Sequence, residues 1–145
     1  SMGGAIGIQA TAQFPQIQAL VTDAAYADLS KAIAMSQWLK YHIPRIPLGQ
    51  MAIWGAQLRL GVRLDKVSPV RSVGQIAPRP VLFIHGEQDI GIPPQEAKAL
   101  YAQAGEPKQL WIVPEAAHAD AFYRQKEVYT KRIVEFFDDG LFRKT

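Results

Sequence analysis

The sequence contains no cysteine, which excludes disulfide bonds and thiolate metal sites in this chain. It also lacks any apolar run of the roughly 18 residues that a membrane-spanning helix requires. The N-terminus does not show the pattern of a signal peptide. We therefore expect no membrane span in the chain and a cytoplasmic location.

Long runs of one charge are missing as well. The 16 basic and 13 acidic residues give a net charge of +3, and no basic run is longer than a pair such as Lys131 and Arg132. Scattered charges are typical of a solvated surface, so we expect no nucleic-acid partner. The hydrophobic content of 48% over 145 residues is enough for the core of one domain, and we interpret residues 1–145 as a single domain.

Three short runs of apolar and β-branched residues have the composition of buried strands, namely Ile17–Val21, Val81–Ile84 and Leu110–Val113. A helix is predicted between the second and third runs, with Pro94 at its first position and Gly105 as its C-terminal cap. A β-α-β crossover makes its two strands parallel. The predicted fold class is therefore α/β, a three-stranded parallel sheet with flanking helices.

Helical spacing or small-residue composition predicts four further helices, at 1–10, 28–39, 48–60 and 128–142. The first of these has a glycine- and alanine-rich face that could pack very close to a sheet. Asp28 is a plausible N-cap for the second. Residues 67–80 contain three prolines and are interpreted as mostly connection. Residues 24–79 together form a predicted helical excursion, similar to a lid.

Asp89 and His118 stand in the loops that follow two neighbouring predicted strands. Because parallel strands end at one edge of a sheet, where open α/β folds place their sites, we expect the two side chains within hydrogen-bond reach. His85, at the end of its strand, is interpreted as structural. Glu87 and Asp120 are interpreted as solvated.

Three segments resemble motifs of the α/β-hydrolases. SMGGA resembles the second half of the nucleophile elbow, with Ser1 as the serine; HGEQDIGIP resembles the loop of the acid, which maps to Asp89; and EAAHADAF resembles the loop of the histidine, which maps to His118. The chain order also matches that family. The resemblance covers essentially all of this chain but only the C-terminal half of the family's fold, and it is nearest to the branch of dienelactone hydrolases and acyl-peptidases.

This resemblance implies a catalytic triad of Ser1, Asp89 and His118, with the backbone amide of Met2 as one oxyanion-hole donor. The family's first elbow glycine, its fifth strand and the loop that supplies the second oxyanion donor have no counterpart here. Loss of one donor costs roughly 100- to 1000-fold in rate, so activity of this chain should be weak. Four aromatic residues could line an acyl pocket, although such residues are more often part of the core: Tyr26, Trp38, Trp54 and Phe122.

The implied function is hydrolysis of a small-molecule ester, thioester or amide through an acyl-serine intermediate, without metal or cofactor. Each motif also has a simpler interpretation. Ser1 and Met2 can be a remnant of tag removal, Asp89 can be a helix cap or turn residue, and His118 can be a hydrogen-bonded loop residue. The alternative function is a non-catalytic folded fragment or interaction module that keeps inherited triad residues.

The strand predicted at Ile17–Val21 has no proline, charge or bulge signal to protect it if it lies at an edge of the sheet. A two-fold axis would pair two copies of this strand antiparallel and cover both edges. We therefore expect a homodimer, formed through this strand or through a swapped N-terminal helix.

Overall fold

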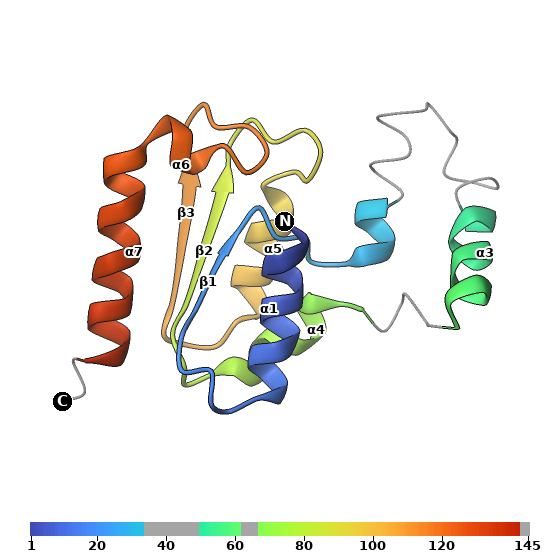
Figure 1. The fold of residues 1–145 in the computed structure, drawn as a ribbon, viewed down its shortest axis with the longest axis horizontal. Helices are drawn as coiled ribbons and strands as arrows, with labels where there is room; N and C mark the ends of the chain where they lie inside the picture. Colours follow the sequence, from blue (N-terminus) through green and yellow to red (C-terminus); the bar gives the residue numbers. More distant parts are fainter. Residues whose placement is uncertain (34–49, 62–66, 143–145) are drawn as a thin grey trace.

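A computed structural model describes residues 1–33, 50–61 and 67–142. At its centre is a sheet of three parallel strands in the order β1-β2-β3, with β1 at Leu20–Asp23, β2 at Val81–Gly86 and β3 at Lys108–Val113. Helices cover both faces of the sheet, α1 and α5 on one side and α7 on the other (Figure 1). The predicted fold class is confirmed.

The central strand β2 explains why its sequence is a continuous apolar run. All six of its residues are buried. Val81 and Phe83 belong to the core on one face of the sheet, whereas Leu82 and Ile84 belong to the core on the other. A strand with a helix layer on each face has no solvent-exposed side, so apolar residues do not alternate with polar ones.

One face of the sheet is covered by α1 (Met2–Gln13), α4 (Pro69–Ser72), the 3-10 helix η3 (Val73–Ile76) and α5 (Gln95–Gln103). The small-residue face of α1 packs closely against the sheet, as predicted. A Cβ atom added at Gly4 would lie 3.0 Å from the Cβ of Ala25 and 3.2 Å from that of Thr22. Larger side chains there would push α1 away from β1.

The opposite face is covered by α6 (Ala121–Arg124) and α7 (Lys126–Leu141). Trp111 of β3 and Phe136 of α7 are buried in the core on this face of the sheet. The helix predicted at 128–142 spans Lys126–Leu141, so it begins two residues earlier than expected.

The first strand begins later than predicted, at Leu20 instead of Ile17. The guanidinium of Arg79 donates hydrogen bonds to the carbonyls of Phe14 (3.1 Å) and Ile17 (3.0 Å), which holds these residues in a turn. Leu20 then donates to the carbonyl of Pro80 and pairs with Val81. Pro80 itself has no N–H with which to extend the ladder toward residue 19.

Two other expectations need correction. Residues 67–80 are more than connection, because they form α4 and η3 and bury Val73 and Ile76 completely. Gly105 is not the C-cap of α5, because Ala104 occupies that position in an extended conformation. A Cβ at Gly105 would lie 2.6 Å from the Cβ of Ala77, so the absence of a side chain allows close packing there.

In the excursion, residues 29–33 are helical and α3 spans Gln50–Leu60. The side chain of Asp28 accepts hydrogen bonds from the amides of Ser30 and Lys31, as expected of an N-cap. Figure 1 shows α3 standing apart from the sheet. Residues 34–49, which include Trp38, and residues 62–66 lie outside the described residues. Over the described ranges, no helix combines the length and apolar character needed to cross a membrane.

Candidate active site at the carboxyl edge of the sheet

Asp89 and His118 meet where β2 and β3 end. The Nδ1 atom of His118 lies 2.7 Å from Oδ2 of Asp89. The Asp89 side chain is completely buried, whereas that of His118 is 43% exposed. The contact expected from the sequence is therefore present, with the imidazole between a buried carboxylate and solvent.

The buried carboxylate of Asp89 is held at both oxygens. Its Oδ1 accepts hydrogen bonds from the amides of Gly91 (3.0 Å) and Ile92 (2.8 Å). Its Oδ2 contacts His118 and also lies 3.3 Å from Nε2 of His85. Burial by itself raises the pKa of Asp89, but the hydrogen bonds from His85, Ile92 and His118 outweigh it and lower the pKa below the ordinary value of 3.8.

The two loops that carry these residues are joined through their backbones. The amide of Gln88 donates to the carbonyl of Ala116 at 2.9 Å. A Cβ at Gly86 would overlap the carbonyl oxygens of Ala116 and Ala117 and lie 2.8 Å from the carbonyl carbon of Ala116. Only glycine at the end of β2 thus allows the histidine loop to approach the acid loop this closely.

Backbone strain follows immediately after the histidine. Ala119 has φ +53°, in the left-handed region that non-glycine residues rarely adopt. Such a conformation costs about 1–3 kcal/mol and persists where surrounding contacts impose it. The strain therefore accompanies the turn that directs His118 toward Asp89.

Ser1 lies at the same edge of the sheet, as the N-cap of α1. Its amino group donates to the carbonyl of Asp23, the last residue of β1, at 2.9 Å. Its hydroxyl makes no capping hydrogen bond. Ala5 is the first residue whose amide bonds back into the helix, so the amide of Met2 belongs to the helix N-terminus, where amides have no intrahelical acceptor.

Asp23 places a second acid near this edge. Its Oδ2 accepts a hydrogen bond from the hydroxyl of Tyr129 at 3.1 Å, while its buried Oδ1 has no partner within the described chain. Burial raises the pKa of Asp23, and the hydrogen bond from Tyr129 together with the positively charged N-terminus offsets this effect only in part. Burial and the Asp23 carboxylate raise the pKa of Tyr129 to about 12.

Of the proposed pocket aromatics, Tyr26, Trp54 and Phe122 lie in the described part of the chain. Trp54 is 63% exposed on α3, which stands away from the sheet, and Tyr26 is buried. Phe122 follows the histidine loop on α6 and makes an edge contact with Tyr129 at 5.6 Å between ring centroids. Phe122 is thus the described candidate that lies near His118 in the chain and beside a residue of the site.

Glu87 is exposed, as interpreted, and Asp120 is partly exposed, and both carboxylates also make polar contacts. Oε2 of Glu87 accepts a hydrogen bond from the amide of Glu115 at 3.3 Å, which adds a link between the two loops. Oδ2 of Asp120 lies 2.7 Å from Nε of Arg124, and this ion pair lowers the pKa of Asp120. Neither of these two contacts involves His118.

Sequence reasoning missed two participants and undervalued a third. Asp23 could have been found, because it is an acid at the carboxyl end of a predicted parallel strand, like Asp89. Tyr129 gives no such signal, since it is one of several aromatic residues on an amphipathic helix. His85 was interpreted as structural, but it contacts Asp89 directly.

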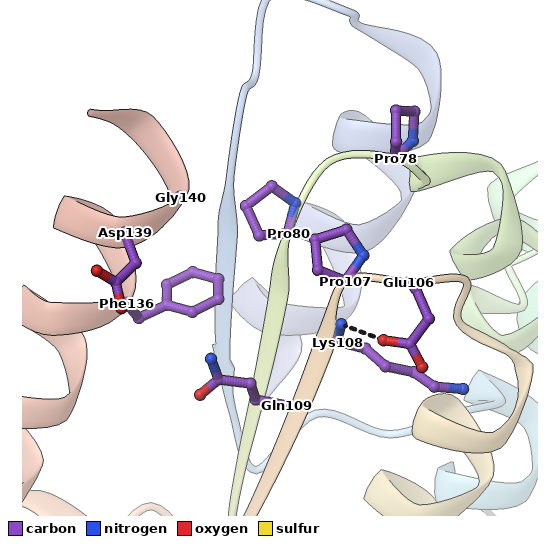
Figure 2. Close-up of a pocket in the computed structure, with 9 residues that line it drawn as sticks. All are labelled: Pro78, Pro80, Glu106, Pro107, Lys108, Gln109, Phe136, Asp139 and Gly140. Carbon is purple, nitrogen blue, oxygen red and sulfur yellow. Dashed lines mark hydrogen bonds between the residues drawn. The ribbon is translucent and has the colours of Figure 1, made fainter. Parts of the chain in front are cut away.

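A hollow of about 420 Å³ lies at the other end of the strands (Figure 2). Its walls come from residues that precede β2 and β3, including Pro80 and Pro107, and from Phe136 of α7. The ammonium of Lys108 already donates to the carbonyls of Tyr101 and Ala104. This hollow therefore offers no counterpart to the paired acid and histidine at the carboxyl edge.

No family model matches the chain. Sequence comparison finds the uncharacterized protein YqkD of Bacillus subtilis, 32% identical over 119 residues, which cover 82% of this chain and 39% of that protein. The α/β hydrolase domain-containing protein WAV2 of Arabidopsis thaliana is 29% identical, with 95% of this chain and 44% of that protein covered. The chain thus spans less than half the length of these relatives.

Solved structures give a similar result for the fold. An acylaminoacyl peptidase of Pyrococcus horikoshii superposes with a TM-score of 0.74 at 20% identity, covering 100% of this chain and 23% of that one. An esterase of Pyrococcus furiosus superposes with a TM-score of 0.69 at 20% identity, covering 97% of this chain and 51% of the esterase. These similarities show that the chain has the fold of the C-terminal half of an α/β-hydrolase.

Proposed function

We propose that this chain carries the catalytic residues of a serine hydrolase that cleaves esters, thioesters or amides through an acyl-serine intermediate. The observation that supports this most is the 2.7 Å contact between the buried Asp89 and the half-exposed His118, at the edge where α1 begins with Ser1. The names of the relatives, which include an esterase and an acylaminoacyl peptidase, agree with this class of chemistry.

In the proposed reaction, Nε2 of His118 takes the proton of the Ser1 hydroxyl as its oxygen attacks the substrate carbonyl. Asp89 accepts the Nδ1–H of His118, which leaves Nε2 free as the base and stabilises the imidazolium that forms. The tetrahedral intermediate then expels the leaving group, which takes the proton from His118. Water, deprotonated by the same imidazole, hydrolyses the acyl-serine and restores Ser1.

The amide of Met2 is the proposed oxyanion donor within this chain. It follows the nucleophile at the N-terminus of a helix of 12 residues, where free amides and the helix dipole favour negative charge. Loss of one oxyanion donor costs roughly 100- to 1000-fold in rate, so an activity that relies on the Met2 amide alone is expected to be weak. The proposed activity is therefore measured best with a reactive probe.

A fluorophosphonate probe tests the proposal directly, because an activated serine displaces its fluoride and becomes phosphonylated. We expect slow labelling of the native chain at Ser1, located by mass spectrometry of the digested protein. Ser1→Ala should abolish labelling, and His118→Gln should reduce it to the level of an unactivated hydroxyl. Ser30→Ala, which changes a serine away from the site, is the matched control and should label like the native chain.

Absence of labelling in a chain with a native circular dichroism spectrum would contradict the proposal. That outcome would favour the second candidate, a non-catalytic folded module that keeps the triad residues. The two functions are thus separated by a single measurement on the same protein.

A further inference from the structure

His85 is a completely buried histidine at the end of β2. Its Nε2 atom lies 2.6 Å from the carbonyl oxygen of Ile92 and 3.3 Å from Oδ2 of Asp89. Its other ring nitrogen, Nδ1, is buried without a hydrogen-bond partner in the described part of the chain. Within the described residues, Nε2 of His85 is therefore occupied by polar neighbours, whereas Nδ1 makes no hydrogen bond.

These contacts define which nitrogen carries the proton. A carbonyl oxygen can only accept a hydrogen bond, so Nε2 must be the donor to Ile92. A second proton on Nδ1 would be a buried N–H without an acceptor, which is costly. The arrangement therefore selects the neutral Nε2–H form of His85.

Neutral His85 cannot serve as the base of the proposed reaction. Its Nε2 already carries a proton directed at Ile92 and Asp89, and its ring has no exposed surface. His118, by contrast, is 43% exposed and uses only Nδ1 to contact Asp89. The two histidines thus contact the same carboxylate in different ways.

Polar contacts connect His85, Ile92 and Asp89 in a closed network. Nε2–H of His85 donates to the carbonyl of Ile92, and the amide of the same Ile92 donates to Oδ1 of Asp89 at 2.8 Å. The loop that follows Asp89 is in this way tied to β2, and the carboxylate cannot rotate without breaking bonds at both oxygens. Because Oδ2 then has a fixed direction, it faces Nδ1 of His118.

We propose that His85 is a positioning residue that holds the Asp89 carboxylate in the orientation required by His118. This inference rests on the proposed function for its meaning in catalysis. The structural part, a neutral Nε2–H histidine that orients Asp89, is testable without any activity.

The first test is the tautomer of His85 in the native chain, read from long-range 1H–15N correlations of the ring nitrogens. We expect the pattern of a neutral imidazole protonated at Nε2. The pattern of a ring protonated at Nδ1, alone or together with Nε2, would overturn the inference. This measurement needs no variant, so it stands even if a substitution at this buried position prevents folding.

The second test compares His85→Gln with His85→Asn, which carry the same amide group on side chains of different length. The amide nitrogen of glutamine can reach the position of Nε2 and donate to Ile92, whereas that of asparagine ends near Nδ1. We expect the low-field Nδ1–H resonance of His118, the signature of its bond to Asp89, to persist in His85→Gln and to be lost or strongly shifted in His85→Asn. An unchanged resonance in a folded His85→Asn variant would contradict the inference.

The fluorophosphonate labelling rate connects this role to catalysis. By analogy with the loss of residues that orient metal-binding histidines, we expect His85→Asn to label about 10- to 100-fold more slowly than the native chain, with partial rescue in His85→Gln. Equal labelling rates for the native chain and His85→Asn would show that the contact between His85 and Asp89 does not contribute to catalysis. If the native chain is not labelled at all, the proposed function fails, while the tautomer and the His118 resonance still decide whether His85 positions Asp89.

Discussion

Two carboxylates at one edge of the sheet, those of Asp89 and Asp23, differ in how many hydrogen-bond donors surround them. Asp89 is surrounded by donors at both oxygens, which favour its charged form. Asp23 has one donor, the hydroxyl of Tyr129, and one oxygen without a partner. Accordingly the pKa of Asp89 is lowered and that of Asp23 is raised relative to the ordinary value of 3.8.

These shifts predict opposite effects of pH on stability. A lowered pKa in the folded state means that Asp89 stabilises the fold above pH 3.8 and that this contribution is lost as the pH falls below it. A raised pKa means that the contribution of Asp23 is fully present below pH 3.8 and is lost as the pH rises through its folded value. Denaturant unfolding at several pH values measures both.

The variants Asp89→Asn and Asp23→Asn serve as controls for each other. The stability advantage of the native chain over Asp89→Asn should shrink as the pH falls below 3.8. Relative to Asp23→Asn, the native chain should instead lose stability as the pH rises above that value. Parallel pH profiles for the two variants would show that this difference between the carboxylates is wrong.

At the scale of elements, the site depends on the junction between the end of β2 and the histidine loop. Gly86 is in backbone contact with Ala116 and Ala117, and Gln88 is hydrogen-bonded to Ala116. The obstructing atoms belong to the backbone, so a side chain at position 86 cannot be accommodated by a rotamer change. The whole loop that bears His118 would have to move.

Gly86→Ala should therefore destabilise the protein by about 1–3 kcal/mol and weaken the bond between His118 and Asp89. Thermal unfolding and the low-field Nδ1–H resonance of His118 report the two effects. Gly55→Ala is the matched control, because a Cβ there meets nothing within 4 Å on the described α3 helix. That substitution should be neutral or stabilising by up to about 1 kcal/mol, since alanine favours helices over glycine. Equal unfolding temperatures for Gly86→Ala and the native chain would contradict the proposed role of this junction.

At the scale of the whole molecule, β1 is an edge strand. It pairs with β2 on one side, and no strand within residues 1–33, 50–61 and 67–142 pairs with its other side. Leu20 and Ala24 donate toward β2, so by alternation the amides of Ala19 and Val21 face the open edge. The carbonyl of Asp23 at the end of this edge accepts from the amino group of Ser1.

A second copy of the chain remains the predicted partner for this edge, through antiparallel pairing around a two-fold axis or a swap of α1. Light scattering at micromolar concentration should then give about twice the chain mass of 16.1 kDa. Ala19→Pro removes an outward amide and should shift the protein toward monomer, whereas Ala19→Ser keeps the amide and should not. A native chain that stays monomeric with this edge open would refute the dimer.

The contact between Asp89 and His118 could be predicted from the sequence because it requires only that the strands preceding them are parallel neighbours. Once two apolar runs are parallel neighbours, the residues that follow them must emerge at one edge. The continuous burial of β2 was predictable for a similar reason, since a strand covered on both faces needs apolar residues throughout.

Other features depend on contacts between residues far apart in the chain, which only the tertiary structure decides. The start of β1 is set by Arg79 and Pro80, about 60 residues away, and Tyr129 reaches Asp23 across 106 residues. The direction of the His85 ring depends on where the carbonyl of Ile92 lies after the turn. Local periodicity carries no information on such contacts, because they arise only when separate elements have been packed against one another.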